Sequence, residues 1–344
     1  MHVHARLTPM GRLTLVMRIE SARPVAHVAV EMSTDAADRV PRQAGAHETG
    51  AYSLRLHTSE KTNQERRTEH EQRPEQHPEP RATVMTGLAL ITGASSGIGR
   101  AFARRLGAEG YDLVVVGRRR DRLEELTAAL PDVEVRPLVA DLGTDAGVGA
   151  VAEVCAARDL TVLVNNASVA HYMPFVELPA DKANELLHVK VVAPTMLTRA
   201  AAPGMVTRGE GTIINVSGML AFSGPASLEE LPLRRAVYTA TLAHIVALSQ
   251  SLHEELAPHG LQVQALCPGV VATEFHERQG LDLRSVARMS ADDVVTASLR
   301  GLELGEVVCA PGVVRPDLLD AVSQADLAAF RAQTHQLAER YQPN

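Results

Sequence analysis

The sequence contains no tryptophan, and aromatic residues make up only 3% of its 344 positions. Proteins that bind single-stranded nucleic acid stack the bases on aromatic rings, and nucleic-acid-binding domains in general carry a basic surface. This chain instead has a formal net charge of −7. Both features argue against a nucleic-acid partner.

Cysteine is also scarce, and Cys155, Cys267 and Cys309 show no paired spacing. We expect these thiols to be reduced and buried, as in a cytoplasmic protein. No apolar run is long enough to span a membrane. Thr14 and Arg18 interrupt the one apolar stretch near the N-terminus, which therefore does not read as a signal peptide. We expect a cytoplasmic protein without a membrane partner.

Residues 57–81 contain no apolar side chain except proline. Such a segment cannot bury enough apolar surface to offset the entropy lost on ordering. We therefore expect residues 1–84 to be a largely disordered extension, with two weak strands at 11–20 and 25–32. It is either a tail without a catalytic role or an over-extended reading frame, and its histidines fit no standard metal site. The folded domain is expected at 85–344.

The most informative stretch is the apolar run 88–91, which Gly93, Gly97 and Gly99 follow directly. A helical repeat of apolar residues comes next and stops at Gly110. Glycines let such a turn approach a phosphate closely, and the N–H groups and dipole of the new helix favour an anion. The pattern predicts a phosphate-binding turn between a buried strand and a helix, although a plain tight turn has the same composition.

From residue 86 onward, strand-like runs alternate with helical patterns. Strands are predicted at 88–92, 112–117, 133–140, 161–165, 212–217, 262–267 and 307–310. This alternation favours right-handed crossovers and a doubly wound, Rossmann-type α/β fold with seven parallel strands. A ligand is then expected beyond the carboxyl ends of the strands, where the strand order reverses.

The second predicted strand ends at Gly117, and Arg118 follows it. An acidic residue at this strand end would bind the ribose 2′-hydroxyl of NAD, whereas a guanidinium suits the 2′-phosphate of NADP. The sequence therefore favours NADP, unless Arg118 merely flanks the edge of the sheet. Asp141, after the third strand, could accept a hydrogen bond from adenine or act as a helix N-cap.

Several later motifs complete a specific set. They are Asn-Asn-Ala at 165–167, Ile-Asn-Val-Ser at 214–217, a tyrosine at 238 and Pro-Gly-Val-Val-Ala-Thr at 268–273. With the glycine turn and Ala-Asp-Leu at 140–142, they resemble the short-chain dehydrogenase/reductase family over residues 85 to about 315. The resemblance implies an NADP(H)-dependent oxidoreductase that interconverts a carbonyl and an alcohol on a small organic substrate, with NAD as the less favoured cofactor. It implies these cofactor-binding residues: Gly93, Ser95, Ser96, Gly97, Ile98, Gly99, Arg118, Asp141, Leu142, Asn165, Ala167, Pro268, Gly269, Val271 and Thr273.

The catalytic positions depart from that family. The family places a lysine four residues after its tyrosine, on the same helix face, where the ammonium lowers the pKa of the phenol. Here Leu242 follows Tyr238 at that spacing. Gly218 aligns with the serine of the family and Lys190 with its asparagine. Only Tyr238, the acid or base, remains in place.

Two hypotheses follow. In the first, Lys190 supplies the displaced charge from a neighbouring helix, and Ser217 or Ser223 takes over the role of the serine. The alternative is that Lys190 is a surface lysine, but Val189, Val191 and Val192 make this stretch apolar. A lysine buried there without a partner would be costly. In the second, the protein binds NADP(H) without turnover, as a sensor or interaction partner.

The remaining expectations concern the substrate side and assembly. Residues 273–290 stand where the family has its substrate lid, with Gly280 as a hinge. We expect His276 to be a solvated residue of that lid and Ser290, with Asp293, to cap the next helix. The apolar faces of the helices that carry Lys190 and Tyr238 could support a homo-oligomer.

Overall fold

The computed structural model describes residues 4–7, 13–16, 87–156, 159–224 and 234–342. The chain divides into two units, 1–76 and 77–344. In the first, β1 (His4–Leu7) and β2 (Leu13–Val16) form an antiparallel pair. The strand predicted at 11–20 is thus present as β2, whereas the strand predicted at 25–32 and the polar segment 57–81 lie outside the described residues.

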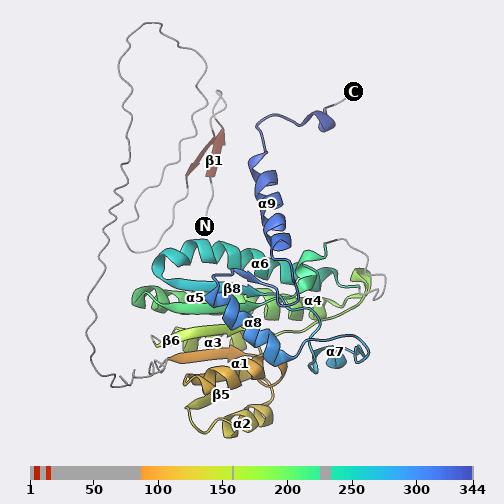
Figure 1. The fold of residues 1–344 in the computed structure, drawn as a ribbon. Helices are drawn as coiled ribbons and strands as arrows, with labels where there is room; N and C mark the ends of the chain where they lie inside the picture. The colour runs from red at the N-terminus through yellow and green to blue at the C-terminus, as the bar shows by residue number, and fades with distance from the viewer. Residues whose placement is uncertain (1–3, 8–12, 17–86, 157–158, 225–233, 343–344) are drawn as a thin grey trace, which may run out of the picture. The chain divides into compact units, whose positions relative to one another are not determined.

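The second unit is built on a sheet of seven strands in the order β5-β4-β3-β6-β7-β8-β9 (Figure 1). The strands are β3 (Leu88–Thr92), β4 (Asp112–Gly117), β5 (Val135–Val139), β6 (Leu160–Asn165), β7 (Gly211–Val216), β8 (Leu261–Leu266) and β9 (Val308–Cys309). All neighbouring strands pair in parallel. The predicted doubly wound fold is confirmed, and the strand order reverses between β3 and β6.

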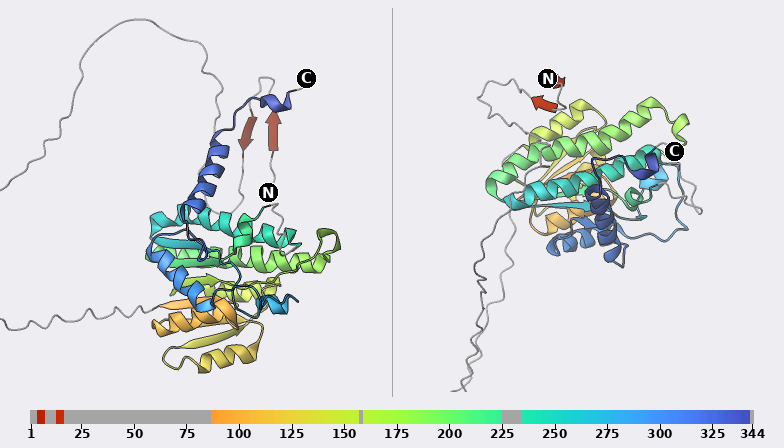
Figure 2. Two further views of the ribbon diagram at one scale, coloured as in Figure 1. Left: turned by 45° about the vertical axis from the view of Figure 1, so that its right-hand side comes forward. Right: turned by 90° about the horizontal axis from the view of Figure 1, so that it is seen from above.

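Helices cover both faces of this sheet (Figure 2). Along β3, Ala89 and Ile91 contact one helical layer, whereas Leu88 and Leu90 contact the other, because successive strand residues point to opposite faces. The first layer holds α1 (Gly97–Ala108), α2 (Arg120–Ala128) and α8 (Ala291–Glu303), and the second holds α3 (Asp145–Cys155) and α5 (Ala193–Arg208). The other helices are α4 (Ala180–Leu187), α6 (Ala236–Leu256), α7 (Phe275–Arg278) and α9 (Asp317–Arg331), with 3₁₀ turns η1 (Phe175–Glu177), η3 (Met219–Phe222), η4 (Ala257–His259) and η5 (Glu339–Tyr341).

Lys190 lies in a turn of π-helix, η2 (His188–Val192), between α4 and α5. Such turns often occur at functional sites. The Lys190 residue is only 2% exposed. This burial excludes the alternative that it is a surface lysine.

Two helix caps bear on the sequence predictions. The Ser290 hydroxyl accepts a hydrogen bond from the Asp293 N–H, 3.0 Å away, and so caps α8 as predicted. Helix α3 is capped by Thr144 instead of Asp141, because the Thr144 hydroxyl accepts from the Gly147 N–H. The N-cap alternative for Asp141 is therefore wrong.

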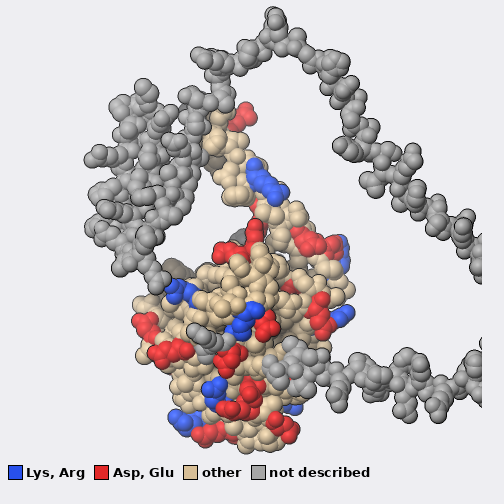
Figure 3. Space-filling view, turned by 90° about the vertical axis from the view of Figure 1, so that its left-hand side faces the viewer, with Lys and Arg blue, Asp and Glu red and all other residues tan. Residues whose placement is uncertain are grey.

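Three further expectations concern composition. Cys155, Cys267 and Cys309 are buried and free. Among the helices that the structure describes, none combines the length and the apolar character that a membrane span requires. Figure 3 shows acidic and basic side chains interspersed over one face of the molecule, without a large area of a single sign.

Candidate active site

A cleft of about 520 Å³ opens beyond the carboxyl ends of the strands. Its lining residues come mainly from segments at the carboxyl ends of strands or just after them: 93–98, 116–119, 140–142, 166–169, 216–220 and 268–276. Lys190, Tyr238 and Leu242 complete it from the helices. The cleft therefore lies where the order of the strands predicts a ligand site.

The turn between β3 and α1 accepts only glycine at its key positions. Gly93 and Gly97 have φ angles of 68° and 54°, in the left-handed region. A Cβ atom on Gly97 would lie 2.9 Å from the Thr273 side chain, and one on Gly99 would lie 2.4 Å from the Gly93 carbonyl oxygen. The first turn of α1 holds no acidic residue of its own. These features fit a dinucleotide pyrophosphate at the N-terminus of α1.

Two guanidinium groups stand at the end of β4. An Arg118 nitrogen lies 3.6 Å from a Glu185 oxygen and 3.9 Å from an Asp141 oxygen. Arg119 extends over the glycine turn and donates to the Ser95 and Ser96 hydroxyls, at 3.0 and 3.1 Å.

Arg119 also donates to the Glu274 carboxylate, at 2.6 Å, and this bond is the main reason why the pKa of Glu274 is lowered. The sequence prediction missed Arg119. The sequence did contain a hint of its role, because Arg119 stands next to Arg118 in a run of three arginines.

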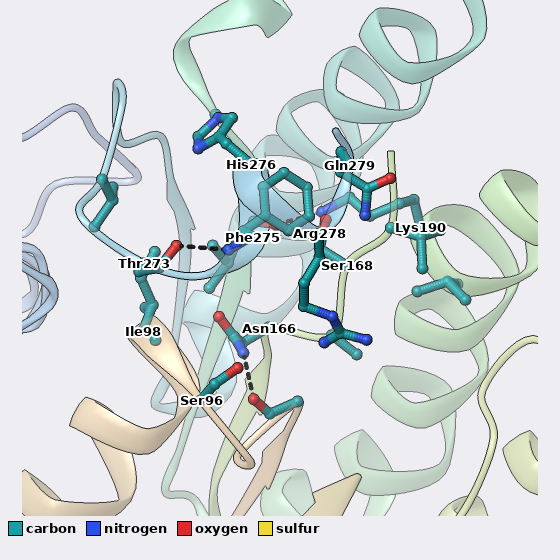
Figure 4. Close-up of a pocket in the computed structure, with 18 of the residues that line it drawn as sticks. Ser96, Ile98, Asn166, Ser168, Lys190, Thr273, Phe275, His276, Arg278 and Gln279 are labelled. Atoms are coloured by element: carbon teal, nitrogen blue, oxygen red, sulfur yellow. Dashed lines mark hydrogen bonds between the residues drawn. The ribbon is translucent and has the colours of Figure 1, made fainter. Parts of the chain in front are cut away.

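The structure places Asn166 rather than Asn165 against the cleft (Figure 4). The Asn165 amide donates to Asn215 and Thr198 in the interior, at 2.8 and 3.1 Å. Asn166 borders the cleft while its amide donates to the Thr92 and Gly93 carbonyl oxygens. The prediction that Asn165 lines the main cleft is therefore corrected by one position. The physical reason is that successive residues at a strand end point in opposite directions.

Tyr238 lies on α6 and is 7% exposed. Its ring packs edge-on against Tyr172, with centroids 5.5 Å apart, and lies 6.5 Å from Phe275. Burial raises the pKa of Tyr238 to about 12, and hydrogen bonds with the side chains of Ser168 and Tyr172 oppose this rise. Ser168 and Tyr172 both line the cleft. Sequence reasoning missed both.

The serines expected to assist Tyr238 have other partners. The Ser217 hydroxyl donates to the Leu242 carbonyl oxygen, at 2.8 Å. The Ser223 hydroxyl donates to the Leu220 carbonyl oxygen and accepts from Arg235, at 2.8 and 3.1 Å. Both residues border the cleft, but the structure directs the Ser217 proton to the backbone instead of to a substrate.

Lys190 stands in the wall of the same cleft. Its ammonium donates to the Val216 carbonyl oxygen, at 2.9 Å. Burial lowers the pKa of Lys190 to about 8, and the nearby Cys267 opposes this effect. Among the described residues, Ser168 and Tyr172 are the groups that lower the pKa of Tyr238, and Lys190 is not one of them. The structure thus brings Lys190 to the cleft but bonds its ammonium to the backbone of β7.

The lid contains the short helix α7, and Gly280 follows it with a φ angle of 77°. His276 lies on α7, lines the cleft and packs edge-on against Phe275, with ring centroids 5.2 Å apart. Burial, with the charge of Arg288, lowers the pKa of His276. The expectation of a solvated loop histidine is therefore wrong, because His276 lies on α7, is half-buried and borders the cleft.

Comparison with known proteins gives a consistent picture. A family model described as short chain dehydrogenase matches residues 87–283. The chain is 30% identical to the very-long-chain 3-oxoacyl-CoA reductase of Mus musculus, over 64% of this chain and 71% of that protein. It is also 30% identical to the oxidoreductase YxjF of Bacillus subtilis, over 71% of this chain and 90% of that one. The chain spans about half the length, 55%, of the 32% identical reductase of Pyrenophora tritici-repentis.

Two solved structures match most of the chain. A short-chain dehydrogenase from Sphingobium yanoikuyae in complex with NADPH is 35% identical, with a TM-score of 0.70, and the match covers 74% of this chain and all of that one. The bulky-bulky ketone specific alcohol dehydrogenase from Comamonas testosteroni is 30% identical, with a TM-score of 0.67, over 75% of this chain and 99% of that one.

Proposed function

Because the chain belongs to the short-chain dehydrogenase/reductase family of oxidoreductases, we propose that it is an NADPH-dependent carbonyl reductase in which Tyr238 donates the proton. The observation that carries the proposal is the position of Tyr238. Its phenol is buried and hydrogen-bonded in the wall of the cleft whose other end holds the glycine turn and two arginines.

The preference for NADPH rests on Arg118 and Arg119. A 2′-phosphate adds negative charge to the adenosine ribose, and charge-assisted hydrogen bonds from guanidinium are well suited to it. Arg119 already contacts the Ser95 and Ser96 hydroxyls, which could bind the same phosphate. The solved relative from Sphingobium yanoikuyae is a complex with NADPH, which supports the same choice.

The protonation state of Tyr238 favours reduction. Bound NADPH would supply a hydride to the carbonyl carbon. The carbonyl oxygen, which becomes an alkoxide, then takes the proton of the Tyr238 hydroxyl. An alkoxide is about as basic as hydroxide, whose conjugate acid water has a pKa of about 15.7, whereas the pKa of Tyr238 is about 12. The proton transfer is therefore downhill. The reverse reaction needs a phenolate, which is present in roughly one molecule in 10⁵ at neutral pH.

One wall of the cleft, around Tyr238, is apolar, although His276, Arg278 and Gln279 also border the cleft. The apolar wall consists of Val169, Tyr172, Val189, Leu220, Phe275 and Leu283. Such a wall suits a ketone with apolar substituents, because polar substituents would lose hydration without compensation. The relatives named above, a bulky-ketone alcohol dehydrogenase and 3-oxoacyl-CoA reductases, make apolar ketones and 3-oxoacyl thioesters the first candidates.

A second candidate is an NADP(H)-binding protein without turnover. Leu242 is 1% exposed and occupies the place of the lysine of the family, and Gly218 offers no hydroxyl. Both observations favour this alternative.

A cytoplasmic location and a homo-oligomeric state also stay predictions.

One experiment separates the two candidates. NADPH and NADH are titrated by fluorescence, and NADPH oxidation is then followed with a panel of apolar ketones and 3-oxoacyl thioesters. The proposal expects tight NADPH binding and turnover that Tyr238→Phe abolishes without loss of binding. Tight binding with no turnover across the panel would instead support the non-catalytic candidate.

A further inference from the structure

We propose that Ser168 is the hydroxyl that holds the substrate oxygen beside Tyr238, in the role that Gly218 leaves unfilled. This inference rests on the proposed reductase function and adds a catalytic residue to it. Ser168 follows the Asn-Asn-Ala motif in the loop after β6. It therefore approaches Tyr238 from the end of β6, whereas Ser217 and Ser223, the serines predicted from the sequence, follow β7.

The cleft needs such a donor because Ser217 and Ser223, the two serines expected to assist Tyr238, have other partners. Ser217 gives its proton to the Leu242 carbonyl oxygen, and Ser223 gives its proton to the Leu220 carbonyl oxygen. A serine hydroxyl has one proton to donate. Neither side chain can therefore donate to a substrate without breaking an existing bond.

Ser168 differs from both in its partner. Its side chain lines the cleft (Figure 4), and the segment that carries it packs on Tyr238, since Val169, Ala170 and Tyr172 share one hydrophobic cluster with that ring. The Ser168 hydroxyl also opposes the rise in the pKa of Tyr238. Two neighbouring hydroxyls can converge on one external acceptor, because each can turn its proton toward it. A carbonyl oxygen placed between Ser168 and Tyr238 would accept from both, and this arrangement orients it for proton transfer.

The proton balance is simple. The carbonyl carbon gains the hydride, its π pair moves to oxygen, and the Tyr238 proton bonds that oxygen to give the alcohol. The pair left on Tyr238 makes a phenolate, toward which Ser168 can then turn its proton. A hydrogen bond to the charged form stabilises that form. Ser168 thus serves the substrate oxygen before the transfer and the phenolate after it.

Tyr172 supports this arrangement as a positioning residue. Its ring packs edge-on against Tyr238, and its side chain also opposes the rise in the pKa of that phenol. Burial raises the pKa of Tyr172, so its hydroxyl keeps its proton and stays a donor. A neighbouring cation would lower the pKa of Tyr238, and Ser168 and Tyr172 supply part of this effect without a charge.

The test compares Ser168→Ala with Ser168→Thr in the full chain. Ser168→Ala should lower kcat for ketone reduction roughly 10²-fold, as when one donor to a developing oxyanion is removed. NADPH affinity and the urea midpoint should be unchanged. Ser168→Thr keeps the hydroxyl and should retain most of the activity. A Ser168→Ala variant with the kcat of the wild type would overturn the inference, and so would loss of NADPH binding, which would indicate a structural role.

A second variant, Gly218→Ser, places a hydroxyl where the family has its serine. A Cβ on Gly218 would lie 3.5 Å from a Leu242 methyl and 3.6 Å from the Pro268 carbonyl oxygen, which are ordinary contacts. Gly218→Ser should therefore fold and should recover activity in the Ser168→Ala background. Failure to recover while NADPH still binds would contradict the shared role.

A titration separates this inference from the proposed function. The ultraviolet absorbance of phenolate is followed against pH, with Tyr238→Phe as the reference for the other tyrosines. Ser168→Ala should raise the apparent pKa of Tyr238, because the phenolate loses a donor. Absence of turnover in the wild type would refute the reductase function. An unshifted titration would refute the pairing of Ser168 with Tyr238, whatever the activity.

Discussion

Replacing Lys190 with methionine should make the protein more stable at neutral pH. Burial lowers the pKa of this lysine from 10.5 to about 8. Each pKa unit corresponds to about 1.4 kcal/mol, so the buried ammonium costs the folded state about 3 kcal/mol. Methionine keeps most of the apolar stem and loses the hydrogen bond to the Val216 carbonyl oxygen, which, with a charged donor, contributes about 2 kcal/mol. The expected net gain in the free energy of unfolding is therefore about 1 kcal/mol.

The sign of the pH dependence follows from the two pKa values. The folded-state pKa is below the unfolded one, so the unfolded chain binds more protons between about pH 8 and 10.5. Stability of the wild type should therefore rise with pH across that window. Below about pH 8 both states are protonated and the cost is complete. The advantage of Lys190→Met should be full at neutral pH and should shrink as the pH approaches 10.5.

Urea unfolding of both proteins, below and above this window, measures the difference. A Lys190→Met variant that is less stable at neutral pH would refute the reasoning, as would a difference that does not change with pH. Either result would mean that the ammonium is better solvated or better paired in the cleft than its single bond to β7 indicates.

The same substitution should lower activity. A lysine retained at a cost in stability is expected to serve function, and Lys190 borders the cleft. We predict that Lys190→Met weakens cofactor binding and cuts turnover roughly 10²- to 10⁴-fold, the range for acid–base groups. Leu242→Lys in this background should recover part of the loss. An unchanged turnover would show that Tyr238 works without Lys190.

The remaining predictions concern the cofactor, the pH profile and the extension. Arg119→Ala should raise the Kd for NADPH about tenfold and barely change that for NADH, with Arg118→Ala as the matched comparison; equal losses for both cofactors would contradict a 2′-phosphate site. The rate of reduction should fall as pH rises through about 8, where Lys190 loses its charge, while Tyr238, with a pKa of about 12, stays protonated. The pH–rate profile of Lys190→Met should not show this fall in rate near pH 8. A protein that begins at Met85 should match the full chain in thermal midpoint and NADPH affinity; a loss of either would assign a structural role to residues 1–84.

The sheet and the glycine turn were predictable because local sequence determines them. Fully buried runs such as 88–92 leave little choice but a central strand. Gly93 and Gly97 require the backbone freedom that only glycine has. The apolar neighbours of Lys190 favoured burial over the surface alternative, and the structure decides for burial.

The contacts around Tyr238 were not predictable, because they join distant parts of the chain. Ser168 and Tyr238 are 70 positions apart, and no spacing pattern links them. The direction of the Ser217 hydroxyl depends on the backbone of α6, which carries Leu242. Which of Asn165 and Asn166 faces the cleft depends on where β6 ends, and a shift of one residue reverses the side.

The central claim, that Tyr238 protonates a ketone during NADPH oxidation, is tested most directly by single-turnover kinetics. The wild type and Tyr238→Phe are each loaded with NADPH, mixed with an apolar ketone, and followed by NADPH absorbance and by the alcohol formed. The account predicts one alcohol per NADPH oxidised in the wild type. It also predicts a rate roughly 10²- to 10⁴-fold lower in Tyr238→Phe at unchanged NADPH affinity. Equal rates in the two proteins would contradict the account.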